Sequence, residues 1–334
     1  MKLLFMDKNK TYLPLLLVVL MVIATFSCIS ENDDDCGITV RFAYNHNILS
    51  ADALRNQVDE VTLYIFDNNG ILAQQYTNAA SSPIIRLADL KSGHYHFVAW
   101  AQSNHITSDQ SYFSIPKLKA GVSSIDELTY RMKREASGFQ RHELNNFLVG
   151  MSKVMIGDDD SHFTVELKKV TNKIRVVLLP YAPGGKLDVA DYEFSIIDKV
   201  GNGHINYDYT LLPDKKIKYL PYYAANLEPN DTGALLPGEI DRAAVVEINT
   251  SRLLEANAPH LCIIEKEGGR KIVSMNLPWV ISLIGTENSR KWSLQEYLDR
   301  QDNYTIILYF NDSNWMNFKI IINGWAINAK EIEL

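Results

Sequence analysis

Cysteine is scarce in this sequence of 334 residues, and the patterns that carry the common catalytic chemistries are missing. Three cysteines are too few for a disulfide scaffold or for a zinc site built from four thiolates. There is no Gly-x-Ser-x-Gly nucleophile elbow, no His-Glu-x-x-His zinc motif, no Walker loop and no dinucleotide-binding glycine fingerprint. We therefore expect neither an enzyme nor a protein that holds a cofactor or a metal ion.

An excess of positive charge is also absent. The 33 lysines and arginines are outnumbered by 40 aspartates and glutamates, which gives a formal net charge of −7. Because nucleic-acid binding needs a concentrated basic surface, this composition argues against nucleic acid as the main partner. Apolar residues make up 46% of the chain, so most of it is expected to fold.

The apolar run near the start of the chain is too short to cross a bilayer. It covers residues 13–26, and these 14 residues fall short of the ~20 that a transmembrane helix requires. The run follows Lys2, Lys8 and Lys10. A basic segment before a short apolar run is typical of a secretory signal peptide.

The run is followed by the small residue Ser27 and then by Cys28. A small residue before a cysteine is what lipoprotein signal peptidases accept, so we predict that residues 1–27 are a lipoprotein signal peptide and that Cys28 is acylated. Stable attachment needs more than one acyl chain. Residues 28–36 carry little apolar surface and are expected to be a lipidated, acidic tether. An ordinary cleaved signal with an incidental cysteine is the alternative.

The rest of the chain alternates apolar and polar residues in short segments. Residues 38–44, 61–66 and 94–100 follow this period of two, and Asp67–Gly70 has the form of a turn between strands. Such a pattern predicts an all-β fold of the sandwich or barrel type.

No linker rich in glycine or proline divides this strand-rich region. The best boundary lies near Lys168–Thr171, between two alternating segments. We therefore predict two β domains in tandem, at residues 37–168 and 169–334. A joint this short implies restricted motion between them.

Four local elements stand out within the two domains. Hairpins are expected at residues 192–209, around Gly201-Asn202-Gly203, and at residues 261–275. A helix is expected over residues 123–135, because Ile125, Leu128 and Met132 fall roughly at helical spacing. A second helix is expected from Ser293 to Arg300, where Ser293 and Glu296 have the form of a reciprocal capping box.

Two patterns resemble metal sites only weakly. His94 and His96 share one face of a strand, but Val98 and Trp100 share that face too and no third ligand is near in sequence. Asp158-Asp159-Asp160 offers three adjacent acids, whereas calcium needs six to eight oxygens in a shaped loop. We interpret both patterns as surface or partly buried structure.

The remaining cysteines and the tyrosines admit a functional and a structural interpretation. Cys36 and Cys262 could pair in an oxidising compartment, but they fall in different domains, and we favour a buried Cys262 and a half-exposed Cys36. Tyr219, Tyr222 and Tyr223 could stack on sugars, although packing is the commoner role of tyrosine in a sandwich.

Several strings, in order along the chain, resemble one family. They are the segment beginning Cys36-Gly37-Ile38, Val61 to Gly70, Gly93 to Trp100, Thr171 to Val176, Thr250 to Leu253 and Ile322 to Trp325. The family is that of the fimbrillin-A-associated anchor proteins, the FimB-like anchor subunits of type V fimbriae. The resemblance covers nearly the whole chain after Cys28. Residues 103–147 match no part of it.

The resemblance implies two transthyretin-like Greek-key β-sandwich domains in a lipoprotein at the outer-membrane surface. It implies that the protein holds the base of a fimbria, whose stalk subunits (fimbrillins) join by donor-strand exchange, and that it ends the fibre. Acidic residues after Cys28 also resemble the export signal of surface lipoproteins in Bacteroides-like bacteria. No small-molecule substrate is expected.

Carried onto this chain, the resemblance makes residues 38–44 a first strand that the anchor keeps. A stalk subunit is implied to lose that strand to an Arg-specific protease, and cleavage at Arg41 is an open alternative here. The joining elements are expected between Phe318 and Leu334. Their candidate contact residues are Phe318, Ile320, Ile322, Trp325, Ile327, Ile332 and Leu334.

Two other functions remain open at this point. One is a fimbrial tip or surface adhesin of the same fold, with its site in loops such as residues 103–147. The other is a surface lipoprotein that binds glycans through exposed aromatic side chains.

Overall fold

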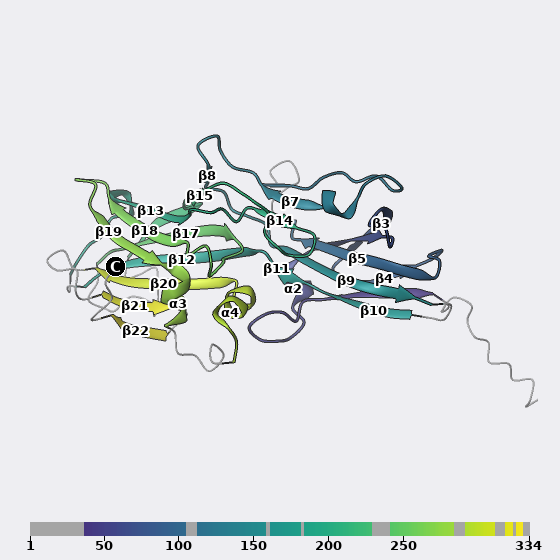
Figure 1. Ribbon diagram of the computed structural model, residues 1–334. Helices are drawn as coiled ribbons and strands as arrows, with labels where there is room; N and C mark the ends of the chain where they lie inside the picture. Colours follow the sequence, from purple (N-terminus) through teal and green to yellow (C-terminus); the bar gives the residue numbers. More distant parts are fainter. Residues whose placement is uncertain are drawn as a thin grey trace, which may run out of the picture.

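Strands dominate the part of the chain that the computed structural model describes. That part comprises residues 37–104, 112–157, 161–181, 184–228, 241–283, 291–310, 318–322 and 325–329. The strands form five sheets, and Figure 1 shows them arranged along one long axis as two sandwiches. The predicted all-β fold is confirmed.

The first sandwich packs a three-stranded sheet against a five-stranded sheet. Phe42 and Leu63, one from each sheet, are both 0% exposed and belong to one hydrophobic cluster. The smaller sheet has the order β10 (Ser161–Glu166), β1 (Ile38–Ala43), β4 (Ile84–Leu87). The larger sheet has the order β11 (Lys168–Lys169), β9 (Phe147–Ile156), β5 (Gly93–Gln102), β2 (Glu60–Phe66), β3 (Leu72–Ala79).

A third layer covers the other face of the five-stranded sheet. It is a small sheet of β14 (His204–Asn206), β7 (Thr129–Met132) and β6 (Phe113–Ser114). The rings of Tyr130 in β7 and Phe147 in β9 lie 4.7 Å apart between centroids. Much of the segment from 103 to 147, which matched no family motif, therefore supplies this layer, together with β14 from far along the chain.

The second sandwich packs a six-stranded sheet against a five-stranded sheet. Ile174 and Phe194, one from each sheet, lie in one cluster. The six-stranded sheet runs β16 (Tyr223–Leu227), β17 (Ala243–Ser251), β12 (Thr171–Pro180), β20 (Asn303–Phe310), β21 (Phe318–Ile322), β22 (Trp325–Ala329). The five-stranded sheet runs β19 (Lys271–Asn276), β18 (His260–Glu265), β13 (Tyr192–Asp198), β15 (Ile217–Tyr219), β8 (Phe139–Gln140).

The helices are short and lie beside the sheets. They are α2 (Leu54–Gln57), α3 (Leu277–Ser282), α4 (Leu294–Arg300) and the 3₁₀ turns at Ile125–Glu127 and Val189–Asp191. The predicted helix after Ser293 is confirmed, since the Ser293 side chain accepts a hydrogen bond from the backbone N–H of Glu296. The Glu296 carboxylate, however, pairs with Arg300 one turn later.

The helix predicted over residues 123–135 is wrong. Only Ile125–Glu127 are helical, and β7 begins at Thr129. Ile125, Leu128 and Met132 are all buried against the same cluster, so their spacing reflects coverage of a sheet and not one face of a helix. The reciprocal cap occurs here instead, where the Ser124 N–H donates to the Glu127 carboxylate over 2.8 Å.

One of the two predicted hairpins is also wrong. The hairpin at 261–275 is confirmed by the antiparallel pairing of β18 with β19. Within 192–209, however, β13 pairs with β15 and β18, while β14 pairs with β7. The Asp198 carboxylate accepts hydrogen bonds from the N–H groups of Val200 and Gly201, and this turn leads the chain out of the sheet.

A single residue separates the last strand of the first sandwich from the first strand of the second. β11 ends at Lys169 and β12 begins at Thr171. The intervening Val170 is 0% exposed, and its N–H donates to the carbonyl of Phe147 over 2.9 Å. One hydrophobic cluster extends from Tyr64 in β2 to Phe310 in β20, so the core is continuous across this joint.

Gly150 allows the chain to cross from β10 to β11. A Cβ atom there would lie 2.2 Å from the carbonyl oxygen of Glu166, which no repacking of a flexible side chain can relieve. We expect Gly150→Ala to lower the free energy of unfolding by about 3 kcal/mol. The matched control is Gly157→Ala just beyond β9, where a Cβ meets nothing within 4 Å. Denaturant titration of both variants measures this. If the two variants were equally stable, the close approach of residue 150 to the Glu166 carbonyl would be contradicted.

Glu247 in β17 carries the densest set of charged contacts on the six-stranded sheet. Its side chain is 7% exposed, with Lys173 Nζ at 2.8 Å and Arg175 Nε at 2.9 Å. The Tyr222 hydroxyl also donates to it. Burial alone raises the pKa of Glu247, but these hydrogen bonds outweigh burial and hold the pKa at about 2, below its usual 4.5.

The lowered pKa of Glu247 predicts how stability depends on pH. The stabilisation is complete above pH 4.5 and is lost as the pH falls toward 2, because the unfolded chain takes up the proton first. Glu247→Gln should cost about 3 kcal/mol at pH 7 and almost nothing at pH 2. The control Glu193→Gln removes a half-exposed ion pair with Lys218 and should cost under ~1 kcal/mol. A cost of Glu247→Gln that does not change with pH would refute the assignment.

Candidate functional site

The first strand, β1, lies in the middle of its sheet. It pairs in parallel with β10 and antiparallel with β4. Val40 and Phe42 are 0% exposed. Removing this strand would therefore uncover the core of the first sandwich and break two ladders of hydrogen bonds.

The two ends of β1 have different surroundings. Its start at Ile38 lies at the end of the molecule far from β21 and β22 (Figure 1). Just after its end, Tyr44 is 2% exposed, and burial and then the nearby Asp302 raise the pKa of its hydroxyl. Arg41 is 59% exposed and lies 3.6 Å from Asp52, so its side chain is accessible although its backbone is paired.

Beyond Tyr44 the chain contacts the second sandwich. His46 Nε2 lies 3.8 Å from a carboxylate oxygen of Glu296 in α4, and Arg300 Nη1 donates to the carbonyl of Asn47. Burial, followed by the positive charges of Lys168 and Arg300, lowers the pKa of His46 to about 4. His46 is therefore neutral near pH 7 and fills the joint without adding charge.

The last two described strands form one edge of the six-stranded sheet. β21 pairs with β20, and β22 pairs with β21 and has no further neighbour among the described strands. Five candidate contact residues lie in these strands, where the register pairs Ile320 with Ile327, Ile322 with Trp325, and Phe318 with Ala329. Ile332 and Leu334 lie outside the described residues. An unpaired edge is the surface that strand addition requires.

Several other predicted residues fall outside the described ranges. These are Cys28, Cys36 and Asp158–Asp160. Cys262 is described, and its thiol is free and buried in β18, as expected. Among the described residues, no helix has both the length and the apolar character that a membrane crossing needs.

The weaker ligand candidates are accounted for by packing or exposure. His94 and His96 lie in β5, and no group of three possible metal ligands occurs among the residues with described positions. Tyr219 is 0% exposed and its hydroxyl contacts Asn202 over 2.5 Å. Tyr222 contacts Glu247, and Tyr223 is 48% exposed. Two of the three tyrosines are thus engaged within the protein.

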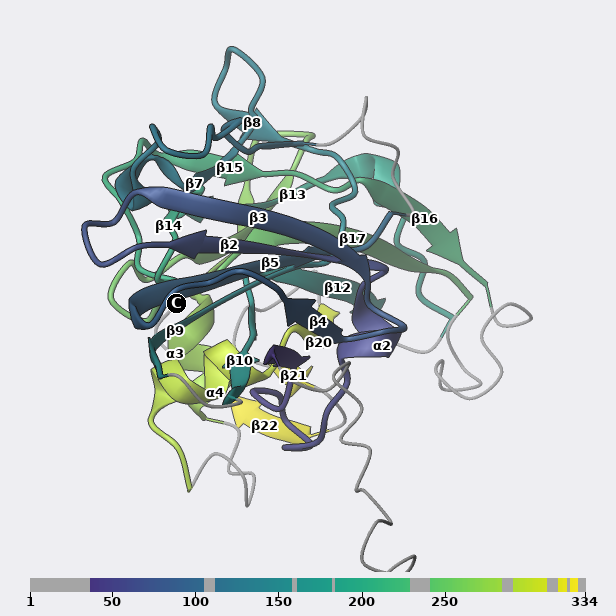
Figure 2. The ribbon, with the colours of Figure 1, turned by 90° about the vertical axis from the view of Figure 1, so that its right-hand side faces the viewer.

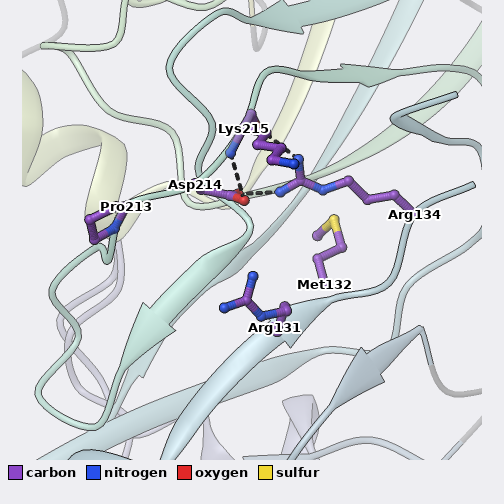
Figure 3. A pocket seen from close by; sticks show the side chains of 6 residues that line it. All are labelled: Arg131, Met132, Arg134, Pro213, Asp214 and Lys215. Carbon is purple, nitrogen blue, oxygen red and sulfur yellow. Dashed lines mark hydrogen bonds and ion pairs between the residues drawn. The ribbon is translucent and has the colours of Figure 1, made fainter. Parts of the chain in front are cut away.

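One cavity in the structure was not predicted from the sequence. It lies where the chain after β7 meets the loop before β15, and has a volume of about 450 Å³ (Figure 3). It is lined by Arg131, Met132, Arg134, Pro213, Asp214 and Lys215. The only signal in the sequence was that two short segments, some 80 positions apart, are each rich in basic residues.

Known proteins similar to this chain include a fimbrial anchor subunit, a candidate polysaccharide-binding protein and a candidate adhesin. The chain is 22% identical over 325 residues to the minor fimbrium anchoring subunit Mfa2 of Porphyromonas gingivalis, with 92% of this chain and 90% of that protein covered. The solved structure of the fimbrial anchor protein Mfa2 from the same species matches with a TM-score of 0.62 at 18% identity, covering 88% of this chain and 99% of that one. This second likeness concerns the fold alone.

Two solved structures from Bacteroides thetaiotaomicron are also similar. A candidate polysaccharide-binding protein is 31% identical with a TM-score of 0.72, and a candidate adhesin is 26% identical with a TM-score of 0.74. Each match covers 88% of this chain and 98% of the other. The family model of the fimbrillin-A associated anchor proteins Mfa1 and Mfa2 matches residues 32–329, which confirms the resemblance carried by the sequence motifs. With a match of this extent, the chain belongs to the family of fimbrillin-A associated anchor proteins.

Proposed function

We propose that this chain is an outer-membrane lipoprotein that anchors the base of a cell-surface fimbria. Acylated Cys28 would hold it in the membrane, and strand-exchange contacts with a stalk subunit would end fibre assembly. The observation that carries the proposal is the position of β1. This strand lies inside its sheet and starts at the end of the molecule far from the open edge at β22 (Figure 1).

The position of β1 explains how assembly would end. A subunit that has lost its first strand leaves a groove that a neighbour's strand fills through main-chain hydrogen bonds and alternate side chains. Here β1 already fills that place, with Val40 and Phe42 fully buried. Among the described strands, the place of β1 is therefore not vacant for a donor strand, and no further subunit would add there on the membrane side.

The open edge at β22 is the proposed contact with the stalk. The order of the six-stranded sheet places β22 last among the described strands. Phe318, Ile320, Ile322, Trp325 and Ile327 lie in β21 and β22, and Ile332 and Leu334 follow in sequence. The proposed contact thus lies at the opposite end of the molecule from the start of β1, as an anchor requires.

Loss of the lipid should release fibres from the cell. We expect Cys28→Ala to yield folded protein and normal fibres that move from the cell surface into the medium, because no acyl chain holds the base. Fibres on cells and in the medium are quantified by immunoblot and electron microscopy. The matched control is Cys36→Ala, which changes a nearby cysteine outside the signal junction and should keep fibres on the cells. Fibres that stay on cells carrying Cys28→Ala would show that this chain does not hold the base.

Shortening the C-terminal end should weaken stalk binding. Deleting Ala329–Leu334 removes the last residue of β22 and everything after it, and we expect stalk capture to fall at least tenfold. Co-purification of stalk subunit with the full-length variant measures this, with circular dichroism to check folding. Deletion of Glu31–Asp35, at the tether, is the control and should leave capture unchanged. Full capture by a folded C-terminal deletion would place the contact elsewhere.

A further inference from the structure

The cavity at Arg131 is built from two distant segments. Arg131, Met132 and Arg134 come from β7 and the residues after it, and Pro213 to Lys215 come from the loop before β15 (Figure 3). The pairing of β7 with β14, which sets His204 opposite Arg131, helps bring the two segments together. The cavity is therefore fixed by the third layer of the fold.

The only carboxylate that lines the cavity is already engaged. Asp214 forms an ion pair with Arg134, and its two oxygens accept hydrogen bonds from the N–H groups of Gly203 and Lys215, each over 2.8 Å. Arg134 in turn donates to the carbonyl of Lys215 over 2.8 Å. Arg134 and Asp214 thus neutralise each other's charge, and their hydrogen bonds to the backbone fix one wall of the cavity.

Two cations that line the cavity remain uncompensated. Among the described residues, neither Arg131 nor Lys215 has a carboxylate partner, although the protein as a whole is acidic. Arg131 Nη2 lies 3.2 Å from both ring nitrogens of His204, so the guanidinium is in direct contact with the imidazole. Burial and the charge of Arg131 lower the pKa of His204, so a neutral ring supports the guanidinium at pH 7. Figure 3 shows this guanidinium turned toward Asp214 and Pro213.

We propose that the Arg131 cavity binds a carboxylate carried on a sugar ring. Arg131 would hold the carboxylate through charge-assisted hydrogen bonds, with Lys215 as a second cation. The exposed ring of Pro213 offers apolar surface to one face of the sugar, whereas Met132 is 2% exposed and belongs to the hydrophobic core. Asp214 and the carbonyl of Pro213 offer acceptors for the hydroxyl groups of the sugar. A bare sulfate or phosphate has no sugar hydroxyls to donate to them.

Size and charge favour this ligand over a longer acidic chain. A cavity of about 450 Å³ admits one hexose-sized group. Because Arg134 is paired with Asp214, only Arg131 and Lys215 among the lining residues can balance a ligand's charge, which suits one carboxylate better than a chain of many. β7 and β14, which lie next to the lining residues, are placed along the long axis between β22 and the opposite end of the molecule (Figures 1 and 2). A base and a stalk attached at those two ends would therefore not sit on β7.

Titration calorimetry of the full chain with methyl glucuronide tests the proposal. We expect a Kd on the order of 1 mM, with binding at least tenfold weaker for methyl glucoside, which lacks the carboxylate. Acetate, sulfate and a short oligoglutamate peptide are the competitors, and each should bind at least tenfold more weakly. Equal binding of acetate or sulfate would reduce the cavity to a general anion site, and tighter binding of oligoglutamate would identify a peptide site. Either result, or no binding of the glucuronide, overturns the proposal.

Single substitutions distinguish the effect of the two unpaired lining cations on binding from the effect of nearby surface charge. Arg131→Gln and Lys215→Gln should each weaken glucuronide binding about tenfold and leave binding of the glucoside unchanged. Lys216→Gln is the matched control, because its side chain is exposed next to Lys215 but does not line the cavity. Thermal melts check that all three variants fold. Unchanged glucuronide binding by folded Arg131→Gln would disprove the assignment, whatever the outcome for fimbrial anchoring.

Discussion

The joint at Val170 sets how the two sandwiches are oriented. Because β11 and β12 are separated by one buried residue, the two sandwiches cannot be arranged independently. Hydrogen bonds cross the joint on several sides: the N–H of Phe147 donates to the Thr171 hydroxyl over 3.2 Å, and the Tyr209 hydroxyl donates to the carbonyl of Lys169 over 3.0 Å. The Lys169 ammonium also pairs with Asp302. A joint of this kind transmits position from one half to the other.

The third layer strengthens that constraint. β7 pairs with β14, and β8 pairs with β15, so residues 129–140 join sheets that also contain strands from beyond residue 200. The segment covers the apolar face of β2 and β5 that carries Tyr64 and Trp100. This is why these strands are buried on both faces, whereas a two-layer sandwich leaves one face of each sheet polar. The same pairings create the Arg131 cavity as a consequence of how the two halves are held together.

The sequence allowed correct predictions where the deciding interactions join residues that are close in the chain. Alternation in β2 and β5 predicted strands because it reports the two faces of one strand. The capping serine at Ser293 acts on an N–H three residues away, so its helix was found. The wrong helix at 123–135 and the wrong hairpin at 192–209 share one cause: their outcome is set by pairings such as β7 with β14, across more than 70 residues. The Arg131 cavity could not be predicted for the same reason. The proposed lipidation of Cys28 rests instead on a local motif, which can be found without knowing the fold.

The course of β1 bears on how an anchor would carry load. Under the proposed attachment at Cys28, a pull on the fibre would act on β1 along its own axis, starting at Ile38. Hydrogen bonds between strands lie across the strand direction, so such a pull stretches the ladders to β10 and β4 together and not one bond at a time. At the far end of β1, the carbonyl of Ala43 accepts from the N–H of Leu167, just before the joint, over 2.8 Å. Force applied at the tether would therefore reach the second sandwich through paired backbone and a buried joint, without passing through a flexible linker.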